Sequence, residues 1–253
     1  MLIDERKNQI LGITKEKTYV SVEELSKRVF ASPATIRRDL ADLERAGLIQ
    51  RVRGGASNIA PSTGEVSSIV RKQTMVVEKR RMATAALQFM KDGRSYFFDS
   101  STTVGEIIPM LGKTHDVTII TTGLENAFCL SSVTNCNTYI AGGQVQNRAA
   151  STIGGDAIDF IKHFNCDAFV FSCHGFSIKA GPTEGTIEQQ RCKKAMLENS
   201  AQHILLVDHT KFGSTLVASF CPLSDIDVLI TDLEPTNEYK EALSHAGVEL
   251  IVV

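Results

Sequence analysis

Five residues in the first quarter of the sequence have side chains suited to reading and holding DNA. Thr35, Arg37 and Arg38 stand together, and Arg51 and Arg53 follow with one residue between them. A guanidinium group donates paired hydrogen bonds to guanine or to phosphate oxygens, and a hydroxyl binds either bases or phosphates. The sequence therefore predicts base reading by the first three residues and phosphate or minor-groove contacts by the last two.

A recognition helix is needed to present the first three side chains. Ser32 is a good N-cap, Pro33 fits the first helical position, and Gly47 ends the pattern. The apolar positions fall at i, i+4 and i+7, on one stripe: Ile36, Leu40 and Leu43. The two arginines lie off this stripe near the helix start, where a recognition helix meets bases. Ser32, at that start, is also expected to contact DNA.

The segments on either side complete a winged helix-turn-helix. Residues 48–53 alternate like a strand that places Arg51 and Arg53 on one face. Upstream, the pattern predicts a helix at 5–15, an extended piece at 19–20, and a helix that Ser21 and Glu24 open with capping-box spacing. Helix, strand, helix, tight turn, arginine-bearing helix and wing follow in the order of that motif.

An ordinary amphipathic helix with solvated arginines would give the same local pattern. Asp39, Asp42 and Glu44 are close enough in sequence to pair with the arginines. An Arg-Arg pair on a helix is usually solvated surface. The order of the surrounding elements favours the DNA-binding interpretation.

A second chemically suited set is the run Asp99, Ser100, Ser101, Thr102 and Thr103. It follows a short apolar segment and precedes a helical pattern, so it places backbone N–H groups and four hydroxyls at a helix N-terminus. That arrangement binds phosphate readily. The spacing is not that of a P-loop, and the sequence has no Gly-x-Gly-x-x-Gly dinucleotide fingerprint. Simple N-capping is the alternative, but five consecutive polar residues exceed what a cap requires.

The run belongs to a regular alternation of strands and helices. Short apolar runs predict strands at 96–98, 117–121, 138–141, 168–172, 204–207, 228–230 and 248–253. Helical patterns occur at 71–90, 104–111, 125–130, 157–163, 188–200 and 238–246. Nearly continuous apolar strands alternating with helices predict a mostly parallel α/β sheet that is covered on both faces.

Small and charged residues follow the predicted strands, where ligands of such sheets bind. The candidates for the same ligand are Gly123, Gly142, Gly143, Gly175 and Lys211. Lys211 is the natural cationic partner of a phosphate, and a solvated loop lysine is the alternative. Gly142-Gly143 could equally mark only a turn.

Other polar residues of this half have an ordinary structural interpretation. His174 and His209 fit loop positions with no further role, the commoner fate of a lone histidine. Glu188, Lys193 and Lys194 fall on a helical pattern, where solvated charges are the default.

The composition is that of an ordinary soluble protein, with 43% hydrophobic and 22% charged residues. The net charge of −2 hides an asymmetry: residues 1–57 hold 11 Lys/Arg and 8 Asp/Glu, or +3, and the remainder holds 16 and 21, or −5. The basic character is therefore local. Specific contacts must contribute more to DNA affinity than bulk charge.

We expect three segments: a DNA-binding domain at 1–57, a linker at 58–70 rich in turn formers, and an α/β domain at 71–253. The six cysteines make no Cys-x-x-Cys pair and no Cys/His cluster with zinc-finger spacing, which indicates reduced thiols, a cytoplasmic location and no metal site. No run approaches the roughly 20 apolar residues of a membrane span.

The sequence resembles the DeoR family of bacterial transcription regulators. The stretch VSVEELSKRVFASPATIRRDLADLERAGLIQRVRGGA resembles its N-terminal domain, with a hallmark at 35–40 and at 53–56, where Arg53 replaces the usual His. Residues 75–232 look like the family's sensor domain, in which 99–103 is similar to the phosphate-binding loop. Further matches are Gly142-Gly143, 167–169, Gly175, Gly181-x-Thr183, Glu188, Lys193, 195–196 and 208–213. Two departures are Gly123, where members often carry Asn, and Ser100 or Ser101, where many have Gly.

The resemblance implies a sensor fold related to ribose-5-phosphate isomerase and CoA transferases. It implies a repressor of sugar-metabolism genes that is controlled by a phosphorylated sugar, without cofactor, metal or catalytic residue. The expected partners are an operator duplex and further copies of the chain, as a homodimer or homotetramer. The alternative is a sugar-phosphate isomerase that carries a DNA-binding domain, with Asp99, Asp167, Glu188 and Lys211 as acid–base groups.

Overall fold

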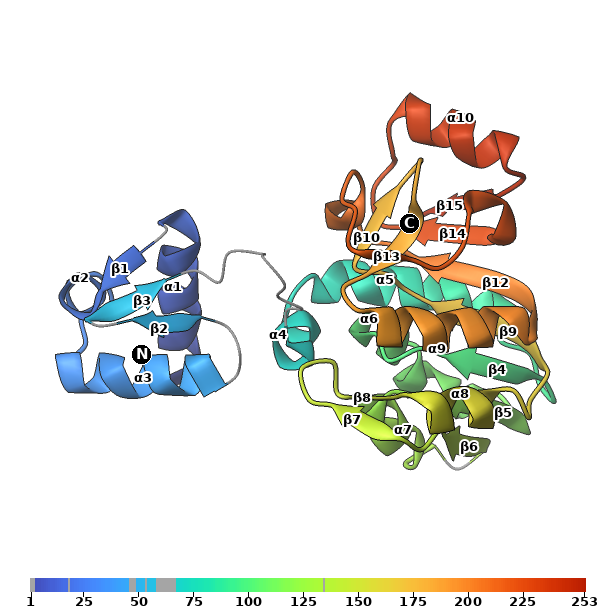
Figure 1. Ribbon diagram of the computed structural model, residues 1–253, viewed down its shortest axis with the longest axis horizontal. Coiled ribbons are helices and arrows are strands. Elements are labelled where there is room, and N and C mark those ends of the chain that lie inside the picture. Colours follow the sequence, from blue (N-terminus) through green and yellow to red (C-terminus); the bar gives the residue numbers. More distant parts are fainter. Residues whose placement is uncertain (1–2, 18, 46–48, 53, 58–66, 134) are drawn as a thin grey trace. The chain divides into compact units, whose positions relative to one another are not determined.

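The computed structural model describes residues 3–17, 19–45, 49–52, 54–57, 67–133 and 135–253. The chain divides into two compact units, Met1–Arg71 and Lys72–Val253 (Figure 1). Among the described residues, no helix combines the length and the hydropathy that crossing a membrane requires.

The first unit is a winged helix-turn-helix. Its elements are α1 (Ile3–Glu16), β1 (Tyr19–Ser21), α2 (Val22–Arg28), α3 (Pro33–Arg45), β2 (Gln50–Val52) and β3 (Gly55–Ser57). The strands form an antiparallel sheet in the order β1-β3-β2, with Val20 and Arg51 both opposite Ala56. The wing is therefore a hairpin of β2 and β3, of which the sequence analysis predicted only the first strand. The predicted helix end at Gly47 lies outside the described residues.

One apolar core holds this unit together. The stripe on α3 is buried as predicted, since Ile36, Leu40 and Leu43 are at most 3% exposed. It packs with residues from the two preceding helices and the small sheet: Ile10, Ile13, Val20, Val22, Leu25, Val29, Ile49 and Ala56. Burying this stripe fixes which side of α3 is left to face a partner.

The second unit is built on seven parallel strands. They are β4 (Ser95–Phe98), β5 (Val117–Thr121), β6 (Cys136–Ile140), β9 (Cys166–Phe171), β12 (Ser200–Leu206), β14 (Val228–Thr231) and β15 (Glu249–Val252). Their order is β15-β14-β12-β9-β4-β5-β6. All seven strands predicted from the apolar runs are present, and the mostly parallel α/β fold is confirmed.

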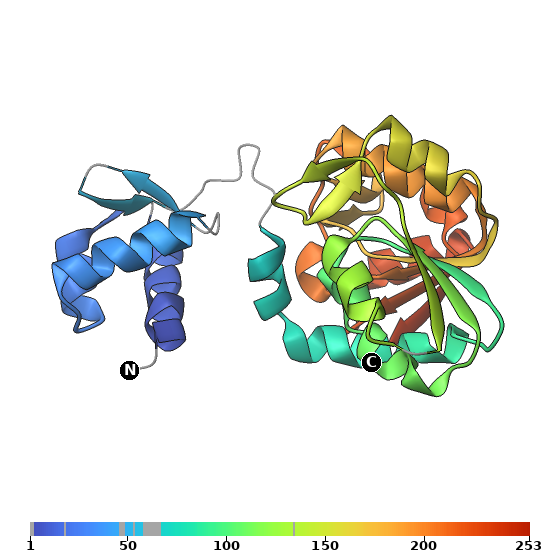
Figure 2. The same ribbon diagram turned by 90° about the horizontal axis from the view of Figure 1, so that it is seen from below.

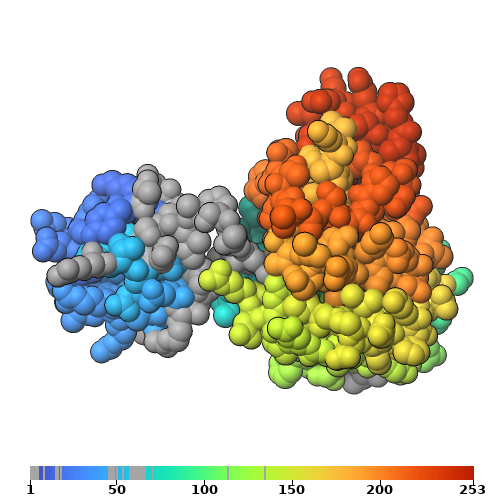
Figure 3. Space-filling model, viewed as in Figure 1, coloured from blue at the N-terminus to red at the C-terminus, as the bar shows by residue number. Residues whose placement is uncertain are grey.

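Helices cover both faces of this sheet (Figures 1 and 2). One face packs against α5 (Val76–Ala86), α6 (Thr102–Gly105) and α7 (Leu124–Leu130). The other packs against α8 (Gly155–Ile161), α9 (Ile187–Glu198) and α10 (Asn237–His245). Figure 3 shows α8 and α9 at the surface of the face drawn there.

Two small antiparallel sheets lie beside the large one and were not predicted. One joins β10 (Gly175–Ser177), β11 (Gly181–Glu184) and β13 (Ala218–Ser219), and the other is the hairpin of β7 (Gln144–Gln146) and β8 (Ser151–Ile153). Short 3-10 turns complete the unit: η1 (Leu87–Phe89), η2 (Ile108–Lys113), η3 (His209–Lys211) and η4 (Leu223–Asp225).

Two predicted helices are not continuous. The segment 71–90 consists of α4 (Ser68–Gln73), α5 and η1, because Met75 adopts a left-handed conformation with φ of 55° that interrupts the helical ladder. The segment 104–111 consists of the short α6 and η2, and a proline opens the second piece.

Candidate functional site

The start of α3 is built around its cap. The Ser32 hydroxyl accepts a hydrogen bond from the Thr35 backbone N–H at 3.2 Å and lies 2.9 Å from the Thr35 hydroxyl. Ser32 is exposed and Thr35 half-buried. Both predicted residues therefore lie at the first turn of α3, where their hydroxyls contact each other.

Two of the acidic side chains of α3, those of Asp39 and Asp42, contact α1. Asp39 is buried and accepts two hydrogen bonds from the Arg6 guanidinium, at 2.6 and 3.1 Å, and Asp42 lies 2.8 Å from the Lys7 ammonium. Arg37 and Arg38 are exposed, and neither has an ion-pair partner among the described residues. These two acids, which could have neutralised the arginines, are thus occupied by α1.

One of the two arginines predicted for the wing, Arg51, lies among the described residues. Arg51 is exposed on β2, and its guanidinium lies 3.6 Å from the Glu44 carboxylate. Its backbone N–H also donates to Glu44 at 3.1 Å. Such an exposed pair is weak and can open to a phosphate. Arg53 lies outside the described residues.

The predicted effector loop, residues 99–103, lies where the direction of strand order reverses. From β4 the chain proceeds to β5 and β6 on one side and then returns to β9 on the other side, so the connections that leave β4 and β9 diverge. Such switch points at carboxyl ends of parallel strands are where ligands bind. Asp99 follows β4 and joins the two diverging connections. Its carboxylate accepts backbone hydrogen bonds from Ser101, after β4, at 2.8 Å and from Ser172, after β9, at 2.9 Å.

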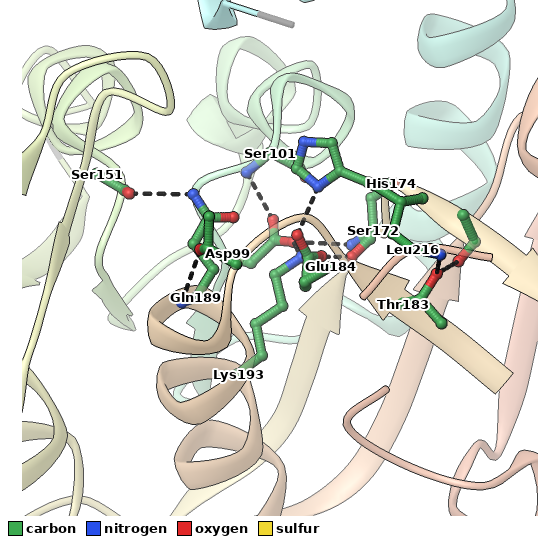
Figure 4. A network of polar contacts seen from close by, with 12 residues as sticks. Asp99, Ser101, Ser151, Ser172, His174, Thr183, Glu184, Gln189, Lys193 and Leu216 are labelled. Atoms are coloured by element: carbon green, nitrogen blue, oxygen red, sulfur yellow. Dashed lines mark hydrogen bonds and ion pairs between the residues drawn. The ribbon is translucent and has the colours of Figure 1, made fainter. Parts of the chain in front are cut away.

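A cluster of buried charged side chains lies next to this switch point and includes Asp99 (Figure 4). The Lys193 ammonium, on α9, lies 2.8 Å from Asp99 and 2.5 Å from Glu184, and it donates to the Ser172 carbonyl at 2.6 Å. The second Glu184 oxygen lies 2.5 Å from His174 Nδ1. Asp99, Glu184 and Lys193 are at most 6% exposed. We call these four residues, Asp99, His174, Glu184 and Lys193, the buried ion cluster.

Lys193 and Glu184 have pKa values that favour their ionised forms despite burial. Burial alone would lower the pKa of Lys193, but the charges of Asp99 and Glu184 outweigh it and hold that pKa above its ordinary value. Burial would raise the pKa of Glu184, but the charges of Lys193 and His174 hold that pKa below its ordinary value. One ammonium thus contacts two carboxylates. The prediction that Lys193 is solvated was wrong, because pairing outweighs the cost of removing it from water.

The run that follows β4 forms a tight loop. The Ser101 hydroxyl caps α6 by accepting from the Val104 N–H at 3.2 Å, as the N-capping alternative describes. The Asn126 side chain donates to the carbonyls of Asp99, at 2.8 Å, and Ser101, at 3.3 Å. The loop conformation is therefore set by the protein itself. The side chains of Asp99 and Ser101 thus help to hold the loop in its conformation.

The other members of the run are Ser100, Thr102 and Thr103. Ser100 and Thr102 are half-buried and Thr103 is buried. The Thr102 hydroxyl accepts a hydrogen bond from the Lys79 ammonium at 3.0 Å. Gly123, after β5, closes over the loop, since a Cβ there would lie 3.0 Å from the Ser100 Cα. Gly123 thus belongs to the same loop cluster.

The remaining predicted residues lie at the same edge but are not all brought together. Gly142 and Gly143 follow β6, and Gly143 has φ of 132° and no room for a side chain, because a Cβ there would lie 2.6 Å from the Ile153 carbonyl oxygen. Gly175 opens β10, against the backbone of Ser214. Lys211 ends η3 after β12 and is half-buried.

Sequence reasoning missed Glu184, Asn126 and Lys79. Glu184 lies on β11, which has no apolar run to reveal it, and Asn126 and Lys79 fall on helical patterns where polar residues are expected to be solvated. The predicted strand ends were the only available signal, and they do not identify side chains that reach the edge from helices.

Both units match family models. Residues 6–62 match the DeoR-like helix-turn-helix domain, and residues 74–233 match the DeoR C terminal sensor domain. The glycerol-3-phosphate regulon repressor of Escherichia coli is 31% identical over 97% of each chain. The HTH-type transcriptional repressor GlcR of Bacillus subtilis is 32% identical over 100% of this chain and 97% of that protein.

Among solved structures, ribose 5-phosphate isomerase A from Methanocaldococcus jannaschii is similar to 55% of this chain over 55% of its own, with 16% identity and a TM-score of 0.40. The two family models cover both units in order, and the relatives align over nearly their full length. The chain therefore belongs to the DeoR family, and it is a DNA-binding transcriptional regulator.

Proposed function

We propose that this regulator is a repressor whose operator affinity is controlled by a phosphorylated sugar, bound at the carboxyl edge of the seven-stranded sheet. The observation that carries the proposal is the loop after β4, which the chain holds at the switch point through Asp99, Asn126 and Ser172. A preformed loop needs little ordering when a ligand binds.

On the DNA side, Arg37 and Arg38 read bases, and Thr35 reads or flanks them. Their support is the exposure of both arginines and the pairing of Asp39 and Asp42 with α1. Ser32, Arg51 and Arg53 contact phosphates and set the register. One winged helix covers few base pairs, so a homodimer or homotetramer binds repeated half-sites.

On the effector side, the phosphate binds near Ser100, Thr102 and Thr103, and Lys211 supplies positive charge. A carboxylate next to a phosphate would normally repel it. Here the Asp99 charge is offset by Lys193 at 2.8 Å, which weakens that repulsion. Gly123, Gly142, Gly143 and Gly175 allow the backbone to approach the ligand closely. The printed name of the Escherichia coli relative, a glycerol-3-phosphate regulon repressor, supports a small phosphoester.

The test is operator binding by the full chain, measured by fluorescence anisotropy on duplexes from upstream of its own and adjacent genes. The effectors tried are glycerol 3-phosphate, a pentose 5-phosphate and hexose 6-phosphates, each beside its unphosphorylated counterpart. At least one phosphorylated compound should change operator affinity, while its counterpart has no effect. Binding to no duplex, or the same response to both forms, would contradict the proposal.

We also propose that the sensor unit binds its ligand without converting it. An isomerase needs an acid–base group that can reach the substrate. The carboxylates of Asp99 and Glu184 are engaged by Lys193, His174 and backbone N–H groups. Asp167 lies at the opposite end of the strands, where it accepts hydrogen bonds from Ser95. Turnover of any compound in the panel would support the isomerase instead.

A further inference from the structure

The helix that opens the second unit lies against the proposed effector loop. Helix α5 follows the segment that connects the two units in the sequence, and it packs on α6, β12 and β14. It is separated from α4 by Met75, whose φ of 55° is unusual for a residue with a side chain. The chain thus enters the sensor unit through a helix that touches the loop, preceded by a break.

Three side-chain contacts join this entering segment to the connections that follow β4 and β5. Lys79 lies 3.0 Å from the Thr102 hydroxyl, Arg80 lies 3.0 Å from Glu106, and Lys72 lies 3.2 Å from Glu125. Thr102 belongs to the proposed effector loop. The entering segment is therefore attached to that loop and to the elements beside it.

The three contacts differ in strength because they differ in burial. The side chains of Lys72 and Arg80 are 55% and 65% exposed, so their ion pairs contribute little. Lys79 is only 5% exposed. An ammonium group held away from water responds strongly to a charge that arrives next to it. A phosphate at the Thr102 hydroxyl would bring such a charge to the Lys79 contact.

We propose that Lys79 is the positioning residue that couples the effector loop to helix α5, and through α5 to the chain that leads to the DNA-binding unit. The proposal rests on the effector site proposed above. The bound phosphate draws Lys79 and Thr102 into a new arrangement, α5 moves with Lys79, and the break at Met75 absorbs the change. A ligand shifts operator affinity only if it binds the two states differently, and Lys79 supplies that difference.

The test measures the response ratio of Lys79→Met: the operator Kd with saturating effector divided by the Kd without it. The effector is the compound of the phosphate panel to which the wild type responds most, and saturation is established by calorimetry. Coupling in such proteins is typically about 5- to 150-fold. We expect the ratio for Lys79→Met to fall to within about twofold of one. Lys240→Met, the same change at a half-buried lysine paired with Glu234, should keep the wild-type ratio.

A second variant, Thr102→Val, tests the same proposal if Lys79→Met does not fold. Thr102→Val keeps the ammonium but removes its hydroxyl partner, and at saturating effector its ratio should also approach one. If folded Lys79→Met or Thr102→Val keeps the wild-type ratio, the proposal is overturned while the effector site stands. A wild-type ratio of one with every compound overturns the effector site, and this inference with it.

Discussion

The recognition helix and the buried ion cluster use charge in opposite ways. On α3, Arg37 and Arg38 are exposed and have no ion-pair partner among the described residues, while nearby acids are paired with α1. In the sensor unit, Lys193 is buried and contacts two carboxylates. The first arrangement leaves positive charge for a partner, and the second uses it inside the protein.

The difference indicates which residues bind and which hold the shape of a site. Exposed charges add little to folding stability, so their removal is felt when the partner binds. A buried charge that loses its partner destabilises the fold, because the partner is left uncompensated in a medium of low dielectric. Mutations in the two regions should therefore affect different measurements.

The largest expected effect is that of Lys193→Met. It leaves Asp99 and Glu184 without their counter-ion, and breaking a buried pair in this way costs about 3–5 kcal/mol of unfolding free energy. Urea unfolding at neutral pH measures the loss. Lys194→Met, the exposed neighbour on α9, should change stability by at most about 0.5 kcal/mol.

The loss should also depend on pH. The pKa of Glu184 is held below its ordinary value, so its stabilising contribution is present above the ordinary value and disappears as the pH falls through the lower one. Lys193→Met removes the main charge that lowers this pKa. The gap in stability between wild type and variant should therefore narrow on acidification. A variant as stable as Lys194→Met would contradict the role given to the cluster.

The next effect is that of replacing Arg37 and Arg38 together with Ala. Each arginine that reads a base contributes about 1–3 kcal/mol, so operator affinity should fall roughly thirtyfold or more. Effector binding and urea unfolding should stay as in the wild type, because both side chains are exposed. The double variant Arg191→Ala/Lys194→Ala removes two exposed charges from α9 and serves as the control. An equal loss in that control would mean that bulk charge, not base reading, gives affinity.

The sequence predicted the strands of the large sheet and the buried stripe of α3 better than it predicted the ion pairs. Parallel strands buried on both faces must be apolar throughout, so all seven strands of the large sheet could be recognised from their runs. The stripe on α3 was recognised for the same kind of reason. Burial leaves a periodic pattern that a single sequence records.

Lys193 shows why the cluster could not be predicted. Its neighbours Glu188 and Lys194 are exposed, and nothing local distinguishes it from them. What buries Lys193 is contact with Asp99 and with Glu184 on a strand of only four residues. Such pairing depends on residues far apart in the chain, which local patterns do not report.

Two adjacent glycines, Gly142 and Gly143, allow a test of which residues maintain the shape of the site and which contact the ligand. A Cβ at Gly143 would lie 2.6 Å from the Ile153 carbonyl, and its φ of 132° suits only glycine. We expect Gly143→Ala to lower the unfolding free energy by about 1–3 kcal/mol. Gly142→Ala meets no atom within 4 Å and should leave stability unchanged. If Gly142→Ala nonetheless weakens effector binding in calorimetry, Gly142 lies at the ligand. Equal losses of unfolding free energy in the two variants would contradict the distinction between Gly142 and Gly143.

The smallest effect concerns a charge pair of intermediate exposure. His209 Nδ1 lies 2.6 Å from the buried Asp232 carboxylate, and this hydrogen bond raises the pKa of His209. Because the folded pKa is the higher one, the stabilisation is complete below the ordinary value of about 6.5 and is lost as the pH rises through the folded value. The side chain is 42% exposed, so solvent limits the contribution to roughly 1 kcal/mol or less. His209→Asn should remove this pH-dependent part of the unfolding free energy. The variant His209→Asn thus compares a partly exposed charge pair with the buried pairs of Lys193. An effect as large as that of Lys193→Met would mean that exposure does not decide what a charge pair contributes to the unfolding free energy.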